Sequence, residues 1–88
     1  MREEIGMMNV TIRYFAAAAE AAGCEQEVLT FEPAATLSSL KTVLRERYGA
    51  DMHRVLEVGS FLINDVVHRS SDQPLAERVD VLPPFAGG

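Results

Sequence analysis

The chain has 88 residues, enough for one compact domain and too few for two ordinary ones. Eight Lys and Arg residues stand against thirteen Asp and Glu residues, so the formal net charge is −5. This acidic balance argues against a nucleic-acid backbone or an anionic membrane as the main partner, and it favours a basic protein partner.

The only cysteine, Cys24, has no second cysteine for an internal disulfide, and the two histidines of the chain give it no zinc-binding spacing. We therefore expect a cytoplasmic protein without a metal or a bound cofactor. No apolar run approaches the roughly 20 residues of a membrane-spanning helix. Residues 1–7 lack the apolar core of a signal peptide, and we expect them to be a loose, disordered leader.

The first third of the chain predicts two strands around a short helix. Residues 8–15 alternate as in a strand, and residues 16–22, six alanines and one glutamate, form a helix that Gly23 ends. Residues 25–31 alternate again, and Pro33 ends this second strand. The inward face of the first strand is predicted to hold Val10, Ile12 and Tyr14.

The main helix is predicted over residues 37–48, with Thr36 as its N-cap and Gly49 beyond its last turn. Its opposite face carries basic side chains, which we interpret as a solvated surface, with contact to an acidic partner as the alternative. The apolar positions, three or four residues apart, are Leu37, Leu40, Val43, Leu44 and Tyr48. The basic side chains are Lys41, Arg45 and Arg47, with Arg54 beyond the helix.

Short elements follow the main helix. Asp51 is expected to cap a short helical turn that groups Met52, Val55 and Leu56. Residues 61–63 are interpreted as a buried strand because all three are apolar.

The last quarter of the chain predicts a turn at Asn64 and Asp65 into a short strand at residues 66–67. Residues 73–75 are expected to form a loop or a single helical turn that places Leu75 in the core. Residues 78–82 alternate as a last strand, whose inward side chains are Val79 and Val81.

This order of elements predicts an α+β fold in which one main helix covers a single mixed sheet. The domain is expected to span residues 8–82, followed by an extended tail over residues 83–88. Parallel pairing of the first and last strands is expected, although alternation alone does not determine it.

The sequence has no Gly-rich phosphate loop, no Gly-x-Ser-x-Gly elbow, no paired-cysteine motif and no His-Glu-x-x-His. A complete active site within the chain is therefore not expected. Cys24 follows a glycine at a helix exit, where nothing lowers its pKa, so we interpret it as a small packing residue. His53 and His68 lie in polar surroundings and are interpreted as surface residues.

The tail is the strongest functional signal in the sequence. The last eight residues, 81–88, contain no charged side chain, and Pro83 with Pro84 holds the backbone extended. Gly87 and Gly88 lack Cβ atoms, so a terminus of this kind fits a channel too narrow for side chains. The alternative is a frayed terminus. Phe85 argues against it, because an aromatic residue is unusual in a segment that serves only as a spacer. We expect the tail to be mobile in the free protein.

A second signal is a set of apolar side chains on the outward face of their strands. When Tyr14 points inward Phe15 points outward, and when Val81 points inward Leu82 points outward beside the tail. Val67 is expected to join them. These residues predict a docking patch at the root of the tail, with burial at curled strand ends as the alternative.

Several sequence features together resemble the MoaD/ThiS sulfur-carrier family of ubiquitin-like β-grasp fold, over about residues 8–88. The most discriminating is the Pro-Pro-x-x-Gly-Gly ending at residues 83–88, which is most similar to the small subunits of molybdopterin synthase. The supporting features are Tyr14-Phe15-Ala16 followed by Gly23, Ile63-Asn64-Asp65 and Pro74-Leu75.

The resemblance implies a carrier cycle rather than an enzyme complete in this chain. An E1-like activating enzyme uses ATP to adenylate the carboxylate of Gly88, and a sulfur donor then converts it to a thiocarboxylate. The large subunit of molybdopterin synthase takes up the tail and transfers its sulfur to the pterin precursor of the molybdenum cofactor. On this interpretation Phe85, Ala86 and Gly87 are held in the channel. The residues that match the family's hydrophobic interface positions are Phe15, Val67 and Leu82.

One departure from the family and two alternative functions accompany this resemblance. The family commonly has an Asp-Gly turn before the last strand, whereas residues 75–79 here are shorter and contain no glycine. A sulfur carrier for thiamine or cysteine synthesis is one alternative. A ubiquitin-like modifier, in which Gly88 forms an isopeptide bond with a lysine, is the other.

Overall fold

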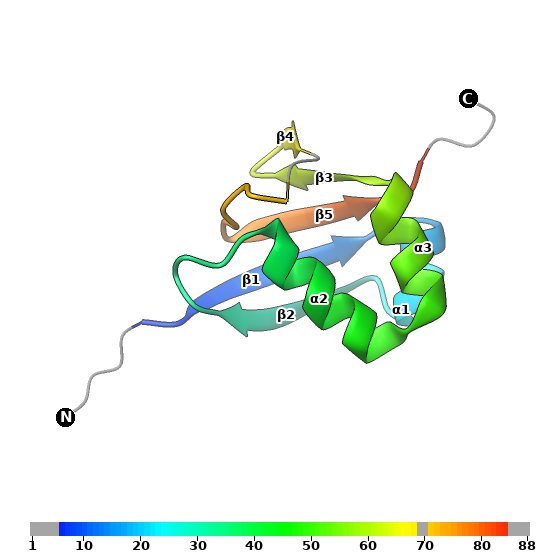
Figure 1. Cartoon of the computed structure of the whole chain (residues 1–88), viewed down its shortest axis with the longest axis horizontal. Coiled ribbons are helices and arrows are strands. Elements are labelled where there is room, and N and C mark those ends of the chain that lie inside the picture. Colours follow the sequence, from blue (N-terminus) through cyan, green and yellow to red (C-terminus); the bar gives the residue numbers. More distant parts are fainter. Residues whose placement is uncertain (1–5, 69–70, 85–88) are drawn as a thin grey trace.

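The structure, a computed structural model, describes residues 6–68 and 71–84. Its five strands form one mixed sheet in the order β2-β1-β5-β3-β4, and its longest helix, α2, crosses one face of that sheet (Figure 1). The elements in chain order are β1 Met8–Tyr14, α1 Ala17–Ala22, β2 Gln26–Phe31, α2 Leu37–Tyr48, α3 Ala50–Val58, β3 Ser60–Ile63, β4 Val66–His68 and β5 Arg78–Leu82.

The first and last strands lie side by side in the middle of the sheet. β1 pairs parallel with β5, and Tyr14 lies opposite Val81 in this register. β2 adds to the other edge of β1, while β3 pairs with β5 and β4 with β3, all antiparallel. The expected α+β arrangement and the expected parallel pairing are therefore confirmed.

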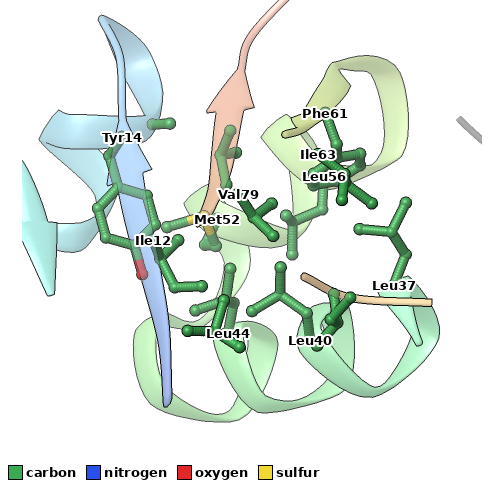
Figure 2. Close-up of a cluster of buried hydrophobic side chains, with 14 of the residues drawn as sticks. Ile12, Tyr14, Leu37, Leu40, Leu44, Met52, Leu56, Phe61, Ile63 and Val79 are labelled. Atoms are coloured by element: carbon green, nitrogen blue, oxygen red, sulfur yellow. The ribbon is translucent and has the colours of Figure 1, made fainter. Parts of the chain in front are cut away.

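The core lies between the sheet and its helices, where side chains from both layers interdigitate (Figure 2). The predicted inward residues of β1 and β5 are all buried, as are three of the five apolar positions predicted for α2; Val43 and Tyr48 are partly buried. These helical positions recur every three or four residues, so they fall on one face of α2. The buried residues of the sheet and of α2 include Val10, Ile12, Tyr14, Val79, Val81, Leu37, Leu40 and Leu44.

The helix that follows α2 differs from the prediction. Residues 50–58 form a nine-residue helix, α3, instead of a short turn, and its N-cap is Gly49 instead of Asp51. Asp51 lies in the first helical turn, where its carboxylate is close to the positive end of the helix dipole. Met52, Val55 and Leu56 are buried together, as predicted.

Two turns are formed by residues with positive φ at positions that the sequence predicts. Gly23 ends α1 with φ of 75°, as predicted. Asn64 and Asp65 have φ of 49° and 71°, which are typical of the two central residues of a type I′ hairpin turn. This turn joins β3 to β4, so the predicted turn is confirmed.

The connection before β5 is made without the family's Asp-Gly turn. Leu75 is buried, and its backbone amide donates to the carbonyl oxygen of Ala35 over 3.0 Å. Two residues later the carbonyl oxygen of Glu77 accepts from the amide of Thr11 over 2.8 Å. These backbone hydrogen bonds, to Ala35 and to Thr11, hold residues 75–77 in place before β5, and no glycine is needed there.

β1 begins at Met8 and β5 ends at Leu82. Residues 1–5 of the predicted leader and residues 85–88 of the predicted tail lie outside the described residues, so the division into leader, domain and tail stays a prediction. Within residues 6–68 and 71–84, the helices are all too short or too polar to cross a membrane.

Candidate functional site

The sheet face that points away from α2, called the outer face below, carries the residues predicted as a partner interface. The amide of Phe15 donates to the carbonyl oxygen of Val81 over 3.2 Å, which places Phe15 beside Leu82 at the ends of β1 and β5. Phe15 is 38% exposed and Leu82 is half-buried. Both follow a buried inward residue, so both side chains face outward as predicted.

Val67 lies on the same face. Val67 is opposite Leu62 in the β3–β4 pair, and Leu62 is opposite Asp80 in the β3–β5 pair. Residues directly opposite one another share a face, and Val67 is 60% exposed. The structure thus brings the three predicted residues onto one face, while their role in binding stays a prediction.

Leu62 belongs to this face as well, which the sequence did not reveal. Residues 61–63 are all apolar, so the alternation that marks a strand with one outward face is absent. In the structure Phe61 and Ile63 are buried and Leu62 is half-buried between Val67 and Asp80. We call the set Phe15, Leu62, Val67 and Leu82 the outer-face patch.

An ion pair between β1 and β5 lies on the same face, beside the outer-face patch. Arg13 and Asp80 are opposite each other in the β1–β5 pair, and Asp80 is only 3% exposed. Arg13 Nη2 donates to Asp80 Oδ2 over 3.3 Å, and Nε lies 3.0 Å from Oδ1 without hydrogen-bond alignment. The guanidinium carbon is 5.5 Å from the centre of the Phe15 ring, within the range of a cation–π contact. Sequence reasoning missed this pair because its members are 67 residues apart.

A strained turn follows Phe15. Ala16 has φ of 52° and ψ of −121°, and the amide of Ala18 donates to the carbonyl oxygen of Phe15 over 2.9 Å. These are the angles of the first central residue of a type II′ turn, where glycine is favoured. A residue other than glycine in such a conformation costs about 1–3 kcal/mol. The turn directs the chain from β1 straight into α1 and leaves Phe15 at its corner.

The root of the tail is fixed by a close backbone approach. A Cβ atom on Gly59 would lie 2.2 Å from the carbonyl oxygen of Leu82, so only glycine lets α3 end against the last residue of β5. Pro83 is half-buried and Pro84 is exposed. The predicted tail residues Phe85, Ala86, Gly87 and Gly88 lie outside the described residues.

A groove flanks this root between α1 and α3. Its apolar lining includes Val58, which is 61% exposed, and its charged lining residues are Glu20 and the ion pair of Asp51 with Arg54 at 2.9 Å. The apolar lining residues are Ala17, Ala21, Val55, Val58, Pro83 and Pro84.

A hydrogen-bonded cluster braces the opposite, inner side of β1. The hydroxyls of Tyr14 and Tyr48 each donate to Glu27 Oε2 over 2.5 Å, and Arg47 Nη2 lies 3.3 Å from Glu27 Oε1. Burial, followed by the hydrogen bond to the Glu27 carboxylate, raises the pKa of Tyr14 and likewise that of Tyr48. Both hydroxyls therefore stay protonated and remain donors. The cluster joins β1, β2 and α2, and it lies away from the outer-face patch.

The remaining candidates form no catalytic group within the described residues. Cys24 is half-buried against the core, and His53 is exposed with its Nε2 atom 3.3 Å from a Glu57 carboxylate oxygen. Within the described parts of the chain, no three His, Cys, Asp or Glu side chains are grouped to hold a metal ion. All four basic side chains of α2 and α3 have local partners. Lys41 and Arg45 donate to the hydroxyls of Ser71 and Thr42. Arg47 contacts Glu27, and Arg54 contacts Asp51.

Comparisons with known proteins place the fold in a family. No curated protein sequence matches the chain. Among solved structures, SAMP1 of Haloferax volcanii has 21% identity, with 91% of this chain and 99% of that chain covered and a TM-score of 0.74. Small archaeal modifier protein 1 of Methanosarcina acetivorans has 23% identity, 94% and 99% coverage and a TM-score of 0.72.

A third solved structure is the complex of subunits 1 and 2 of the molybdopterin-converting factor from Helicobacter pylori. It is 26% identical, covers 92% of this chain and 100% of that chain, and has a TM-score of 0.64. The ThiS family model matches residues 12–88, from β1 to the Gly-Gly ending. With its five-stranded mixed sheet, its covering helix and this match over most of its length, the chain belongs to the ThiS family of small proteins with the ubiquitin-like β-grasp fold.

Proposed function

We propose that the chain is a sulfur carrier and the small, non-catalytic subunit of a molybdopterin synthase. The observation that carries this proposal is the family match through Gly87 and Gly88, at the end of a tail without charged side chains. The root of this tail, at Leu82 and Pro83, lies beside the outer-face patch. A partner docked on the patch therefore meets the tail where it leaves the domain.

The proposed chemistry takes place at the Gly88 carboxylate. An E1-like activating enzyme transfers AMP from ATP to this carboxylate, which releases pyrophosphate and leaves an acyl adenylate. A sulfur donor then displaces AMP and leaves a thiocarboxylate. In the active site of the large subunit this sulfur is transferred to the pterin precursor for its dithiolene, and water returns Gly88 to a carboxylate. Gly87 has no Cβ atom and so allows a narrow channel to close around the tail, with Phe85 and Ala86 held in the same channel.

The proposed docking surface is the outer-face patch. Phe15, Val67 and Leu82 present apolar area that a monomer of this size has no structural reason to expose together. A complex of subunits 1 and 2 is known for the related Helicobacter pylori protein. We propose the corresponding large subunit as the partner here. We propose a cytoplasmic location, because the cytoplasm keeps a thiol such as that of Cys24 reduced.

Deletion of Gly88 tests the chemistry separately from the fold. We expect the variant to lose sulfur transfer completely, because the reacting carboxylate is displaced by one residue. Its urea unfolding midpoint should stay at the wild-type value, because the described core ends at Val81. Deletion of Gly6, an exposed glycine outside the strands, is the control and should leave transfer unchanged. Pterin synthesis by the Gly88 deletion variant would refute the proposal.

The direct measurement is tandem mass spectrometry of the C-terminal peptide from protein purified out of its own host. The sulfur must be localised to Gly88 by fragmentation. The mass increase from replacing one oxygen by sulfur is almost the same as the mass increase from oxidising one of the four methionines. A plain carboxylate that persists with activating enzyme, ATP and a sulfur source present would contradict the carrier function.

The second candidate is a protein modifier, favoured by the similarity to two small archaeal modifier proteins. The same acyl adenylate would then be attacked by a lysine amine of a target protein instead of by a sulfur donor. Covalent adducts of higher mass in denatured lysate would favour this function, whereas a carrier should give few. A carrier for thiamine or cysteine synthesis would be recognised by the large protein with which it copurifies.

A further inference from the structure

The outer face is poor in acidic side chains although the protein as a whole is acidic. Alternation along the described strands places Arg13, Arg78 and Asp80 as their only charged residues on this face. Asp80 is paired with Arg13, and Arg78 is paired with Asp65 at 2.7 Å. The net charge of −5 therefore does not describe the outer-face patch. The partner's contact surface need not be basic, contrary to what composition alone indicates.

The contacts of Arg13 leave part of its guanidinium unused. Asp80 pairs with Arg13 from the side: Nη2 donates one hydrogen to Oδ2, and Nε lies 3.0 Å from Oδ1 without hydrogen-bond alignment. A guanidinium has five N–H donors in a planar fork, so the second Nη2 hydrogen and both Nη1 hydrogens remain. Among residues 6–68 and 71–84, no further acceptor for Arg13 is found. Its side chain is 40% exposed, so Arg13 is accessible to a partner at the β1 side of the patch.

A partner that covers the patch takes these donors out of water. A buried donor without an acceptor costs about 1–3 kcal/mol, and more when the group is charged. The two terminal nitrogens of the guanidinium form a flat fork that matches the two oxygens of a carboxylate. Asp80, almost fully buried, fixes Arg13 from the side and so orients this fork outward.

We propose that Arg13 is a specificity-determining residue that binds a carboxylate of the large subunit, an Asp or Glu side chain set in an otherwise apolar contact surface. The apolar part of that surface covers Phe15, Leu62, Val67 and Leu82. This inference rests on the proposed function for the identity of the partner, and it adds the chemistry by which the partner is recognised.

The test is a binding titration by calorimetry with the purified large subunit of molybdopterin synthase from the same host. Arg13→Lys keeps the positive charge but loses the fork, and we expect its affinity to fall by about 10- to 100-fold. Arg78→Lys is the matched control, because Arg78 is equally exposed on the same face and also paired with an aspartate. Its affinity should change by less than about threefold. Urea unfolding of each variant verifies that it is folded.

A double variant keeps the test valid if Arg13→Lys folds poorly. Arg13→Met with Asp80→Leu replaces the whole ion pair by apolar side chains, an exchange that proteins often tolerate without loss of stability. If Arg13 binds a carboxylate, this variant loses affinity as well. If the patch is recognised only through its apolar area, the variant binds at least as tightly as the wild type, and the proposal is wrong.

The remaining outcomes separate this proposal from the proposed function. If the wild type binds and Arg13→Lys loses no more affinity than Arg78→Lys, the role of Arg13 is refuted and the sulfur-carrier function stands. If the wild type does not bind the large subunit at all, both are refuted. One Asp→Ala or Glu→Ala change in the large subunit should weaken wild-type binding yet have little further effect on Arg13→Lys.

Discussion

At the scale of single residues, Gly59 is the one glycine among the described residues whose missing Cβ is required by close packing. Its φ of −86° is open to any residue, so its role is not conformational. An added Cβ would lie 2.2 Å from the Leu82 carbonyl oxygen and 2.8 Å from that of Val55. Only the structure shows that β5 is what excludes a side chain at this position.

We expect Gly59→Ala to lower the free energy of unfolding by about 1–3 kcal/mol, because two backbone segments must move apart. The measurement is urea unfolding followed by circular dichroism. Gly6→Ala is the control, since a Cβ there meets nothing within 4 Å, and its effect should stay within about 0.5 kcal/mol. Equal midpoints for both variants would show that β5 adjusts without cost.

At the scale of elements, Glu27 connects two strands and the main helix. The carboxylate accepts from Tyr14 on β1 and Tyr48 on α2, and the two rings meet edge to face with centroids 6.3 Å apart. These are the only two tyrosines of the chain. Both hydroxyls must be protonated to donate, so this junction depends on pH.

We expect stability to fall above about pH 10, the usual pKa of tyrosine. Because burial raises the pKa of Tyr14 in the folded state, the folded protein keeps a proton that the unfolded chain loses. The stabilisation is complete below the unfolded pKa, and it is lost as pH rises through the window above it. The loss amounts to at most about 1.4 kcal/mol per pH unit for Tyr14.

Urea unfolding at two pH values, about 9 and 11, measures this slope, and Tyr14→Phe should reduce it. Both proteins are compared in a Lys41→Arg background, which replaces the only lysine of the chain by a residue of the same charge. If Tyr14→Phe in that background leaves the slope of the unfolding free energy against pH unchanged, Tyr14 does not cause the pH dependence.

At the scale of the whole molecule, the last strand holds the sheet together. β5 lies between β1 and β3 in the sheet order, so it joins the pair β2-β1 to the pair β3-β4 (Figure 1). Without β5 the chain retains two separate two-stranded ribbons, which are marginal in water. The segment that completes the sheet is thus also the segment from which the tail emerges.

We expect a chain of residues 1–77, which lacks β5, to show no cooperative unfolding transition by circular dichroism. A chain of residues 1–84, which keeps β5 and both prolines, is the matched control and should unfold at the wild-type midpoint within about 0.5 kcal/mol. A cooperative transition in the shorter chain would show that β5 is dispensable for the fold.

The sequence by itself determined the elements and which of their faces are buried. Alternation predicts Val10, Ile12 and Tyr14 inward and Phe15 outward, and a three-to-four-residue spacing predicts the buried face of α2. These properties are local, since they depend on backbone geometry within a few residues. The Gly-Gly motif at residues 87–88 is local too, because glycine lacks a side chain whatever the fold that precedes it.

Only the tertiary structure decided which residues lie opposite one another. The ion pair of Arg13 with Asp80, the position of Leu62 in the outer-face patch and the need for glycine at 59 all depend on β5 lying between β1 and β3. Strand order and register are set by packing of the whole core, and alternation within a strand contains no information about its neighbour. The sequence therefore predicts which side chains point to the outer face, whereas it does not predict that Arg13 and Asp80 pair on that face.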